Sequence, residues 1–239
     1  MIIDCHLHVK NGDYYRTENS GEEIVQALDK GGIDKGVVFA ICTSTRESTD
    51  MVYKEVQKYP DRLIGFAYAR PSYDRIVADD IRYALAQRNM KGIKIHRGET
   101  LLHPDVIGPV LEVAIEYDVP CLIDSGDDFP AISGIVERYP MLKLILPHLG
   151  SPSGKVFEID KYIELARNHE NVYLDTAYVP TYWKIKDAIE RLGPQKVLYG
   201  SDGILVDPRT ELMKIEVLNF SPETKEYLYY KNIARLLKL

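Results

Sequence analysis

Short apolar runs separated by amphipathic stretches constrain the fold of this chain more than any other feature of its sequence. Runs that are apolar throughout suit strands buried on both faces, and helical stretches between them are typical of parallel β-α units. Eight units of this kind close most naturally into a (β/α)8 TIM barrel, which we therefore predict. The eight runs are 2–5, 36–41, 63–69, 92–95, 121–123, 143–146, 172–174 and 197–199.

The C-terminal segment predicts one further helix that closes the barrel. Ser221 is a typical N-cap, Pro222 suits the first helical position, and Glu223 lies near the positive end of the helix dipole. No linker, low-complexity segment or block of like charge interrupts the sequence. We therefore expect residues 1–239 to form a single domain with short loops.

Charge and composition narrow the classes of partner. The chain has 239 residues, a formal net charge of −6 and a pI near 5.6, without a run of Lys or Arg. These values argue against nucleic acid or an anionic membrane and favour a small-molecule substrate. No stretch has the length of a membrane span and the N-terminus lacks a leader pattern, so a cytoplasmic protein is expected. Short loops also leave room for a second copy to wall the pocket, so a homo-oligomer is one expectation.

Two histidines near the N-terminus, His6 and His8, are the first candidates for chemistry. Residues two apart on a strand point to the same face, so the two rings should lie side by side, with Cys5 facing away. Neutral imidazole is a ligand for divalent transition metals. The alternative is a half-buried strand whose histidines only bond to their neighbours. Three cysteines without paired spacing predict reduced core residues rather than a disulfide framework.

Polar residues close several other apolar runs. Chemistry in such barrels sits at the carboxyl ends of the strands, so these side chains should converge in space. Imidazoles and carboxylates meeting there indicate a metal site. The residues are Lys94, His96 and Arg97 after the fourth run, Asp124 after the fifth, His148 after the sixth and Asp202 after the eighth.

Each of these residues also has a structural interpretation. His148 could bond to the backbone of a turn, and Asp202 could cap a turn or helix. Arg70 and Arg97 are suited to bind a substrate carboxylate in a bidentate manner, but exposed ion pairs at the rim explain them equally well. Tyr178 could wall a substrate pocket or pack on the next helix.

Motifs along nearly the whole chain resemble one known family. They include Ile3-Asp4-x-His6-x-His8, His148-Leu149-Gly150 and Gly200-Ser201-Asp202, together with residues 62–66, 91–96, 119–123, 139–143, 171–175 and 232–236. In order and spacing they resemble the amidohydrolase superfamily. The similarity is greatest to the amidohydrolase-related (amidohydrolase 2) metal-dependent hydrolases, which include aminocarboxymuconate-semialdehyde-type decarboxylases.

The resemblance implies roles for particular residues. It implies that His6 and His8 bind the metal, that Asp202 is both ligand and catalytic base, and that His148 is catalytic and binds substrate or a second metal. The family's usual strand-five histidine is replaced by Asp124. Either Asp124 donates a carboxylate oxygen to the metal or His96 completes the site, and a carbamylated Lys94 could bridge two metals.

The expected activity is hydrolysis of an amide, ester or lactone through a metal-activated water, with zinc as the expected ion and manganese or iron as alternatives. A non-oxidative decarboxylase is the first alternative, because the same scaffold also supports release of carbon dioxide. A metal-poor binding protein descended from the enzyme is the second, because the strand-five histidine is missing.

Overall fold

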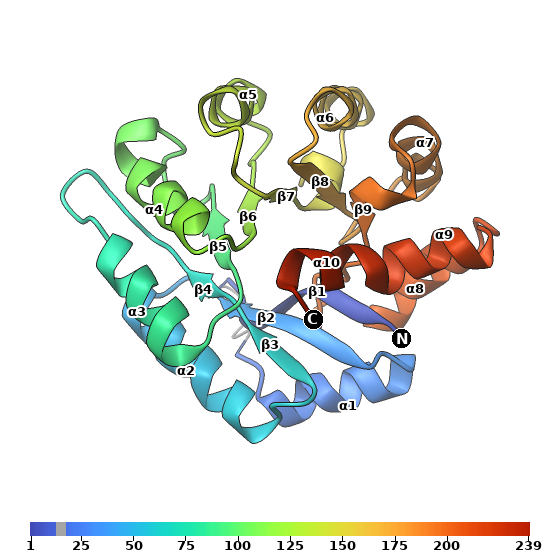
Figure 1. Ribbon diagram of the computed structural model, residues 1–239. Coiled ribbons are helices and arrows are strands. Elements are labelled where there is room, and N and C mark those ends of the chain that lie inside the picture. Colours follow the sequence, from blue (N-terminus) through green and yellow to red (C-terminus); the bar gives the residue numbers. More distant parts are fainter. Residues whose placement is uncertain (13–17) are drawn as a thin grey trace.

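Parallel strands form the centre of the molecule and helices surround them (Figure 1). The computed structural model describes residues 1–12 and 18–239. The elements are β1 (Ile3–Lys10), α1 (Gly21–Gly31), β2 (Lys35–Ala40), α2 (Thr45–Lys58), β3 (Leu63–Gly65), β4 (Ala67–Tyr68), α3 (Ala78–Arg88), β5 (Ile93–His96), α4 (Pro104–Glu116), β6 (Cys121–Asp124), α5 (Phe129–Arg138), β7 (Leu144–Leu146), the 3-10 turn η2 (His148–Gly150), α6 (Val156–Asn168), β8 (Val172–Asp175), α7 (Trp183–Leu192), the 3-10 turn η3 (Pro194–Lys196), β9 (Val197–Leu198), α8 (Pro208–Glu216), α9 (Pro222–Glu226), the π-helical turn η4 (Tyr227–Lys231) and α10 (Asn232–Leu237).

The predicted TIM barrel is confirmed, although its third strand is split. β1, β2 and β3 form one parallel sheet, and β4 to β9 form another. The backbone changes partner at Phe66, whose N–H donates to Val38 O, while the next N–H, of Ala67, donates to Gly92 O. One apolar run therefore supplies both β3 and β4. β1 and the region of β9 close the ring, since Cys5 N donates to Tyr199 O and His8 N donates to Gly203 O.

Two layers of apolar side chains make up the core. The larger layer lies between the strands and the surrounding helices, as expected for strands buried on both faces. The smaller cluster joins side chains from strands around the barrel with residues of the last helix. It includes Ile3, Val37, Ile64, Leu122, Ile145 and Leu198 from strands and Ile233, Leu236 and Leu237 from α10.

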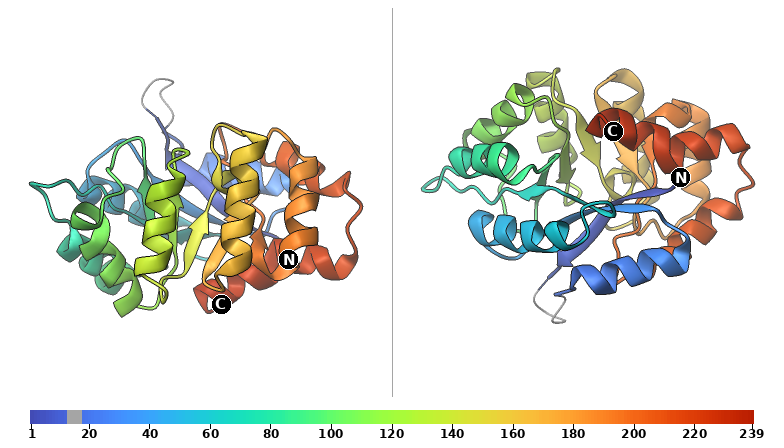
Figure 2. Two further views of the ribbon diagram at one scale, coloured as in Figure 1. Left: turned by 90° about the horizontal axis from the view of Figure 1, so that it is seen from above. Right: turned by 60° about the horizontal axis from the view of Figure 1, so that its bottom comes forward.

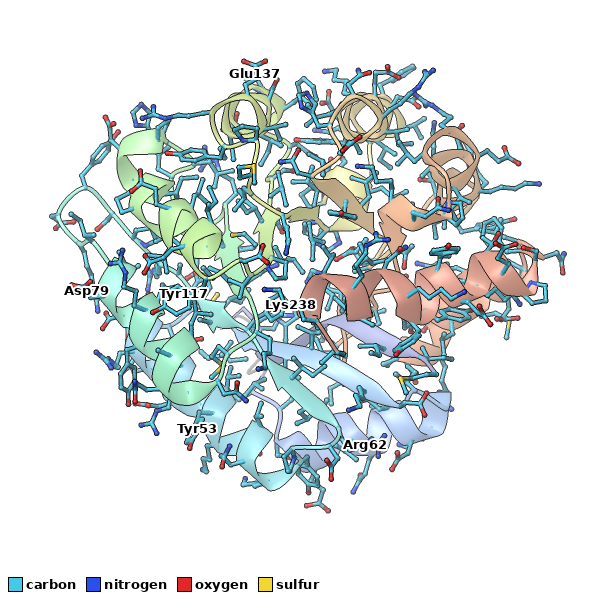
Figure 3. All side chains as sticks on the ribbon, in the orientation of Figure 1. Tyr53, Arg62, Asp79, Tyr117, Glu137 and Lys238 are labelled. Carbon is cyan, nitrogen blue, oxygen red and sulfur yellow. The ribbon has the colours of Figure 1, made fainter. Side chains whose placement is uncertain are left out.

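The predicted closing helix lies across one end of the barrel, which is the end seen in Figure 1 and from other sides in Figure 2. Ser221 caps α9 by accepting the N–H of Thr224, and Pro222 occupies its first turn. Buried Asn232 donates to Pro194 O and Val197 O, which ties α10 to the start of β9. Lys238, labelled at this end in Figure 3, pairs with Asp118 at 2.7 Å. The opposite end is left for the site.

Leu236→Ala is expected to lower the free energy of unfolding by about 2–5 kcal/mol, because it removes methyl groups from a packed interior. Leu236 belongs to the smaller cluster and is 2% exposed. Leu239→Ala is the matched control, since that side chain is 54% exposed. Urea unfolding of both variants measures the difference. Equal midpoints would contradict a packed closing helix.

Cys5 does not line the cavity that His6 and His8 line, as predicted, but the expected alternation of faces along β1 is wrong at this residue. The Sγ atom of Cys5 lies 3.9 Å from Asp175 Oδ2, the same oxygen that contacts His6. Cys5 also belongs to the smaller cluster of apolar side chains. The register of β1 against β2 shifts between Asp4 and Leu7, so simple alternation fails there. No disulfide joins Cys5, Cys42 and Cys121, as predicted, but Cys42 is half-buried rather than a core residue. Within the described residues, no helix is both long and apolar enough to cross a membrane.

Candidate metal centre and active site

The candidate site lies where the strands end, opposite the closing helix. A cavity of about 80 Å³ opens there. Most of the side chains around it are ionisable, and they come from strands all around the barrel, as the polar strand ends predicted. The cavity is lined by His6, His8, Asn11, Ile41, Lys94, His96, Asp124, His148 and Asp202.

His6 and His8 lie side by side on β1, with ring centroids 5.3 Å apart, as predicted. Each ring meets an acceptor at Nδ1. His6 Nδ1 lies 3.0 Å from Asp175 Oδ2, and His8 Nδ1 lies 3.4 Å from Lys10 O. A proton on each Nδ1 leaves Nε2 with its lone pair. Burial lowers the pKa of both histidines, which favours the neutral form that metals require.

Asp202 completes a cluster of three ligand atoms. Its Oδ1 lies 2.9 Å from His8 Nε2 and 3.4 Å from His6 Nε2. The ligand atoms of the three residues all lie within 4.8 Å of one another. Burial would raise the pKa of Asp202, but the contact with His8 and the nearby His6 and His148 rings outweigh it and hold that pKa below its usual range. The carboxylate is therefore ionised and available to a cation.

The backbone at Asp202 is held in an unusual conformation. Its φ is +64°, a left-handed value that few residues other than glycine adopt. Its N–H donates to His6 O at 2.9 Å, and Asp4 Oδ1 accepts the N–H groups of both His6 and Ser201 at 3.0 Å. These bonds join the end of β9 to β1. They compensate for the local strain and fix Asp202 against the two histidines.

Asp175, at the end of β8, supports His6 and the turn that carries His148, a role not predicted from the sequence. Its Oδ2 faces His6 Nδ1, while its Oδ1 accepts the backbone N–H groups of His148 and Ala177 at 3.0 and 2.9 Å. One carboxylate therefore orients a candidate metal ligand and also holds the turn that carries His148. Its place directly after a buried run, like that of Asp124, was the signal that could have identified it.

Asp175→Asn is expected to weaken metal binding about 10–100-fold, because carboxylates behind ligand histidines fix their tautomer and orientation. Glu190→Gln is the control, since Glu190 is exposed and pairs with Lys186 on the surface of α7. Competition with a chromogenic chelator measures the affinity of each variant for zinc. The same affinity in both variants would contradict the supporting role of Asp175.

His148 lies on η2, after β7, and its ring lies next to that of His6, with the ring centroids 5.3 Å apart. Its φ is +60°, and Leu149 and Gly150 also have positive φ. His148 Nδ1 lies 2.7 Å from Ala177 O and so carries a proton. Its Nε2 lies 3.7 Å from Asp124 Oδ2. Burial would lower the pKa of His148, but Asp124 and Asp202 outweigh it and raise the pKa to about 9, so the ring is a cation at neutral pH.

Asp124 faces two imidazoles. Its Oδ2 lies 3.7 Å from both His96 Nε2 and His148 Nε2, and its Oδ1 accepts the N–H of Gly126 at 2.9 Å. Burial would raise the pKa of Asp124, but His148, Lys94 and His96 hold it well below its usual range. Asp124 is thus an ionised group of the same cavity. Its role as a metal ligand stays a prediction, and so does that of His96.

Lys94 lies deeper in the barrel than His96, as expected. It is 1% exposed, and its Nζ lies 4.7 Å from the centre of the Phe39 ring. Burial lowers the pKa of Lys94, although Asp124 and Asp202 act against this. Its position is compatible with a role at the cavity. Carbamylation of Lys94 stays a prediction.

The candidate substrate-binding residues lie outside the cavity lining. Arg70 Nε is 3.7 Å from Glu99 Oε1, and Arg97 Nε donates to Asp128 Oδ2 at 3.3 Å. Both arginines therefore have ion-pair partners in the structure. Tyr178 is 53% exposed, after β8. Substrate binding by these three residues stays a prediction.

A TIM barrel with a His-His-Asp cluster at the carboxyl ends of its strands has three side chains whose ligand atoms could hold a metal ion. The family model described as Amidohydrolase matches residues 3–239, and the chain belongs to this family, as the resemblance implied. The superfamily is metal-dependent. No curated protein sequence matches the chain significantly.

Solved structures share the fold at low identity. An uncharacterised TIM-barrel protein from Bordetella bronchiseptica has a TM-score of 0.79 and 14% identity, with 99% of this chain and 98% of that chain covered. 4-Oxalomesaconate hydratase from Rhodopseudomonas palustris has a TM-score of 0.78 and 18% identity, with 100% and 96% covered. 5-Carboxyvanillate decarboxylase from Novosphingobium aromaticivorans, complexed with manganese and a nitrobenzoic acid, has a TM-score of 0.74 and 19% identity, with 94% and 82% covered.

Proposed function

We propose that this protein is a metal-dependent hydrolase that cleaves an amide, ester or lactone bond of a small molecule through a metal-activated water. The observation that carries the proposal is the position of ionised Asp202. It lies against the free Nε2 atoms of His6 and His8 and lines the same cavity as His148. A base and an acid therefore line one cavity that a small substrate group can enter.

The donor set fits a divalent transition metal. Two imidazole nitrogens and one carboxylate oxygen are ligands that zinc, manganese and iron accept, and three protein ligands leave a coordination position open. A metal ion held by His6, His8 and Asp202 would act as a Lewis acid and lower the pKa of water. We propose zinc, with manganese and iron as alternatives. Manganese is supported by its presence in the related decarboxylase structure.

The chain's own residues supply the proton transfers. Asp202 accepts the proton of the attacking water, because its carboxylate is ionised and reaches the cavity. His148 then donates a hydrogen bond from Nε2 to the substrate oxygen on which negative charge develops, and a proton to the leaving group. Asp175 holds both His6 and the backbone of His148 in place during these steps.

A non-oxidative decarboxylase is the second candidate, and the state of His148 favours it. A buried imidazolium beside the His6-His8-Asp202 cluster is suited to protonate the carbon from which carbon dioxide leaves. Two decarboxylases of this fold, acting on 5-carboxyvanillate and on 2,6-dihydroxybenzoate, support the same alternative. Water is not incorporated in that reaction, which separates it from hydrolysis.

Isotope incorporation tests the two proposals together. Protein loaded with zinc, manganese or iron is incubated in oxygen-18 water with a panel of lactones, esters and amides, and separately with hydroxybenzoic acids. Hydrolysis predicts one oxygen-18 atom in the product and no carbon dioxide. Carbon dioxide release without oxygen-18 in the product would support the decarboxylase instead. Absence of stoichiometric metal and of any product would favour the metal-poor binding protein.

A further inference from the structure

Glu99, three residues beyond the end of β5, contacts several groups near the cavity and has no role in the proposed mechanism. Its Oε2 accepts the O–H of Tyr68 at 2.5 Å and the backbone N–H of Cys42 at 2.9 Å. The same oxygen lies 3.7 Å from His96 Nδ1. Its Oε1 lies 3.7 Å from Arg70 Nε. This carboxylate is thus held in place by groups from β4 and from the loop after β2.

The ring of His96 is confined on three sides. Glu99 faces Nδ1 and Asp124 faces Nε2, each at 3.7 Å. Gly98 lies against the edge between them, because a Cβ added there would come within 2.8 Å of His96 Cε1 and 3.2 Å of Nδ1. The backbone turns back at this point, with the N–H groups of Glu99 and Thr100 both donating to His96 O at 3.0 Å. Ring rotation is therefore restricted.

The two nitrogens of His96 have different surroundings. Nδ1 is buried and has no hydrogen-bond partner among the described residues, and the Glu99 carboxylate 3.7 Å away is the acceptor that faces a proton there. Nε2 faces Asp124 Oδ2, which the cationic His148 also approaches. The pKa of Glu99 is lowered to about 2: burial raises it, but the contacts with His96, Tyr68 and Cys42 outweigh this, so the carboxylate is ionised. Contacts of this kind are often long in a ligand-free site and shorten when the ligand binds.

We propose that Glu99 is a positioning residue that holds the proton of His96 on Nδ1, so that Nε2 faces the cavity as a hydrogen-bond acceptor. His96 and Asp124 then form a pair of acceptors on the side of the cavity away from β1. A substrate hydroxyl or N–H group placed between them satisfies both. This specificity role rests on the proposed function, whereas the protonated nitrogen of His96 is a property of the protein alone.

Long-range proton–nitrogen correlation spectra of the histidine rings test the proposal directly. They are recorded on nitrogen-15-labelled protein as purified, after exchange of any paramagnetic ion for zinc, in alkaline solution where free histidine is neutral. His96→Gln assigns the His96 signals among the six histidines. The expected result is a protonated Nδ1 and an unprotonated Nε2. A ring protonated at Nε2 instead would overturn the proposal.

Glu99→Gln tests whether this carboxylate sets the tautomer. An amide can donate to Nδ1 as well as accept from it, so His96 should shift toward the form protonated at Nε2. His148 is the internal control, because its Nδ1 contacts Ala177 O and should keep its proton. An unchanged His96 spectrum in folded Glu99→Gln protein would overturn the role of Glu99.

Gly98→Ala provides a second variant that keeps every charge. Its Cβ should push the His96 ring away from Glu99 and change the His96 signals, whereas Gly134→Ala adds a Cβ with nothing within 4 Å and should not. Identical His96 spectra in both variants would show that the ring is not held as proposed. None of these measurements needs a substrate, so a failed activity assay leaves their outcome intact.

Discussion

Asp202→Asn protein is expected to contain little bound metal after purification, while its fold is retained. Asp202 Oδ1 lies close to both His6 Nε2 and His8 Nε2. An amide oxygen has no net charge and is a weaker ligand for a dication, so the loss should exceed the roughly 10–100-fold expected for groups behind the ligands. Elemental analysis of protein purified without chelator measures the metal content.

The same variant should lose most of its catalytic rate even when excess metal is supplied. Asp202 is the proposed base for water, and a positioned general base contributes about 10²–10⁴-fold to a rate. His8→Ala should lose metal as well, whereas Asp128→Asn, a change in the cap of α5, should not. Full metal content in both Asp202→Asn and His8→Ala would contradict the assignment of the cluster.

Asp124→Ala distinguishes the two interpretations of the missing strand-five histidine. Asp124 faces His96 and His148, and it is not among the described residues whose ligand atoms form the His6-His8-Asp202 cluster. We therefore expect Asp124→Ala to keep its metal and to lower the pKa of His148. Metal loss in this variant would instead make Asp124 a fourth ligand.

The barrel could be predicted because its signal is local and repeated. Each apolar run with its following helix is a separate indication of a β-α unit, so an error at the boundary of one element does not change the predicted number of units. The split of the third strand could not be predicted. Phe66 donates to β2 and Ala67 to the segment before β5, and nothing in the run 63–69 records which neighbour each residue pairs with.

The site could be predicted where its residues lie on a strand or a few residues after one. His6 and His8 lie on β1, His148 follows β7 and Asp202 follows β9, and all four line one cavity. Supporting residues were harder to identify, because their roles depend on contacts between distant parts of the chain. Asp175 meets His6 across 169 positions. Glu99 lies in a loop beyond its strand, and its partners come from neighbouring strands, so its type and spacing carry no signal.

His148→Gln is expected to lower the catalytic rate about 10²–10⁴-fold, the contribution typical of a positioned general acid. Glutamine can place an N–H near the position of Nε2 but cannot release a proton. The proton-donor role therefore predicts a large loss in kcat with a smaller change in KM. A variant with unchanged kcat would contradict the role of His148 as acid in either proposed reaction.

The pH dependence of the stability of the metal-free protein tests independently whether His148 is protonated in the folded state. Asp124 and Asp202 raise the pKa of His148 from 6.5 to about 9, so the folded state binds its proton more tightly than the unfolded state does. This stabilisation is complete below pH 6.5 and is lost as the pH rises through about 9. Unfolding free energies measured between these limits should therefore fall more steeply for the unaltered protein than for His148→Gln. Parallel curves would mean that the folded metal-free protein does not hold the proton on His148. His148 could then act as an acid only if binding of the metal or the substrate caused it to become protonated.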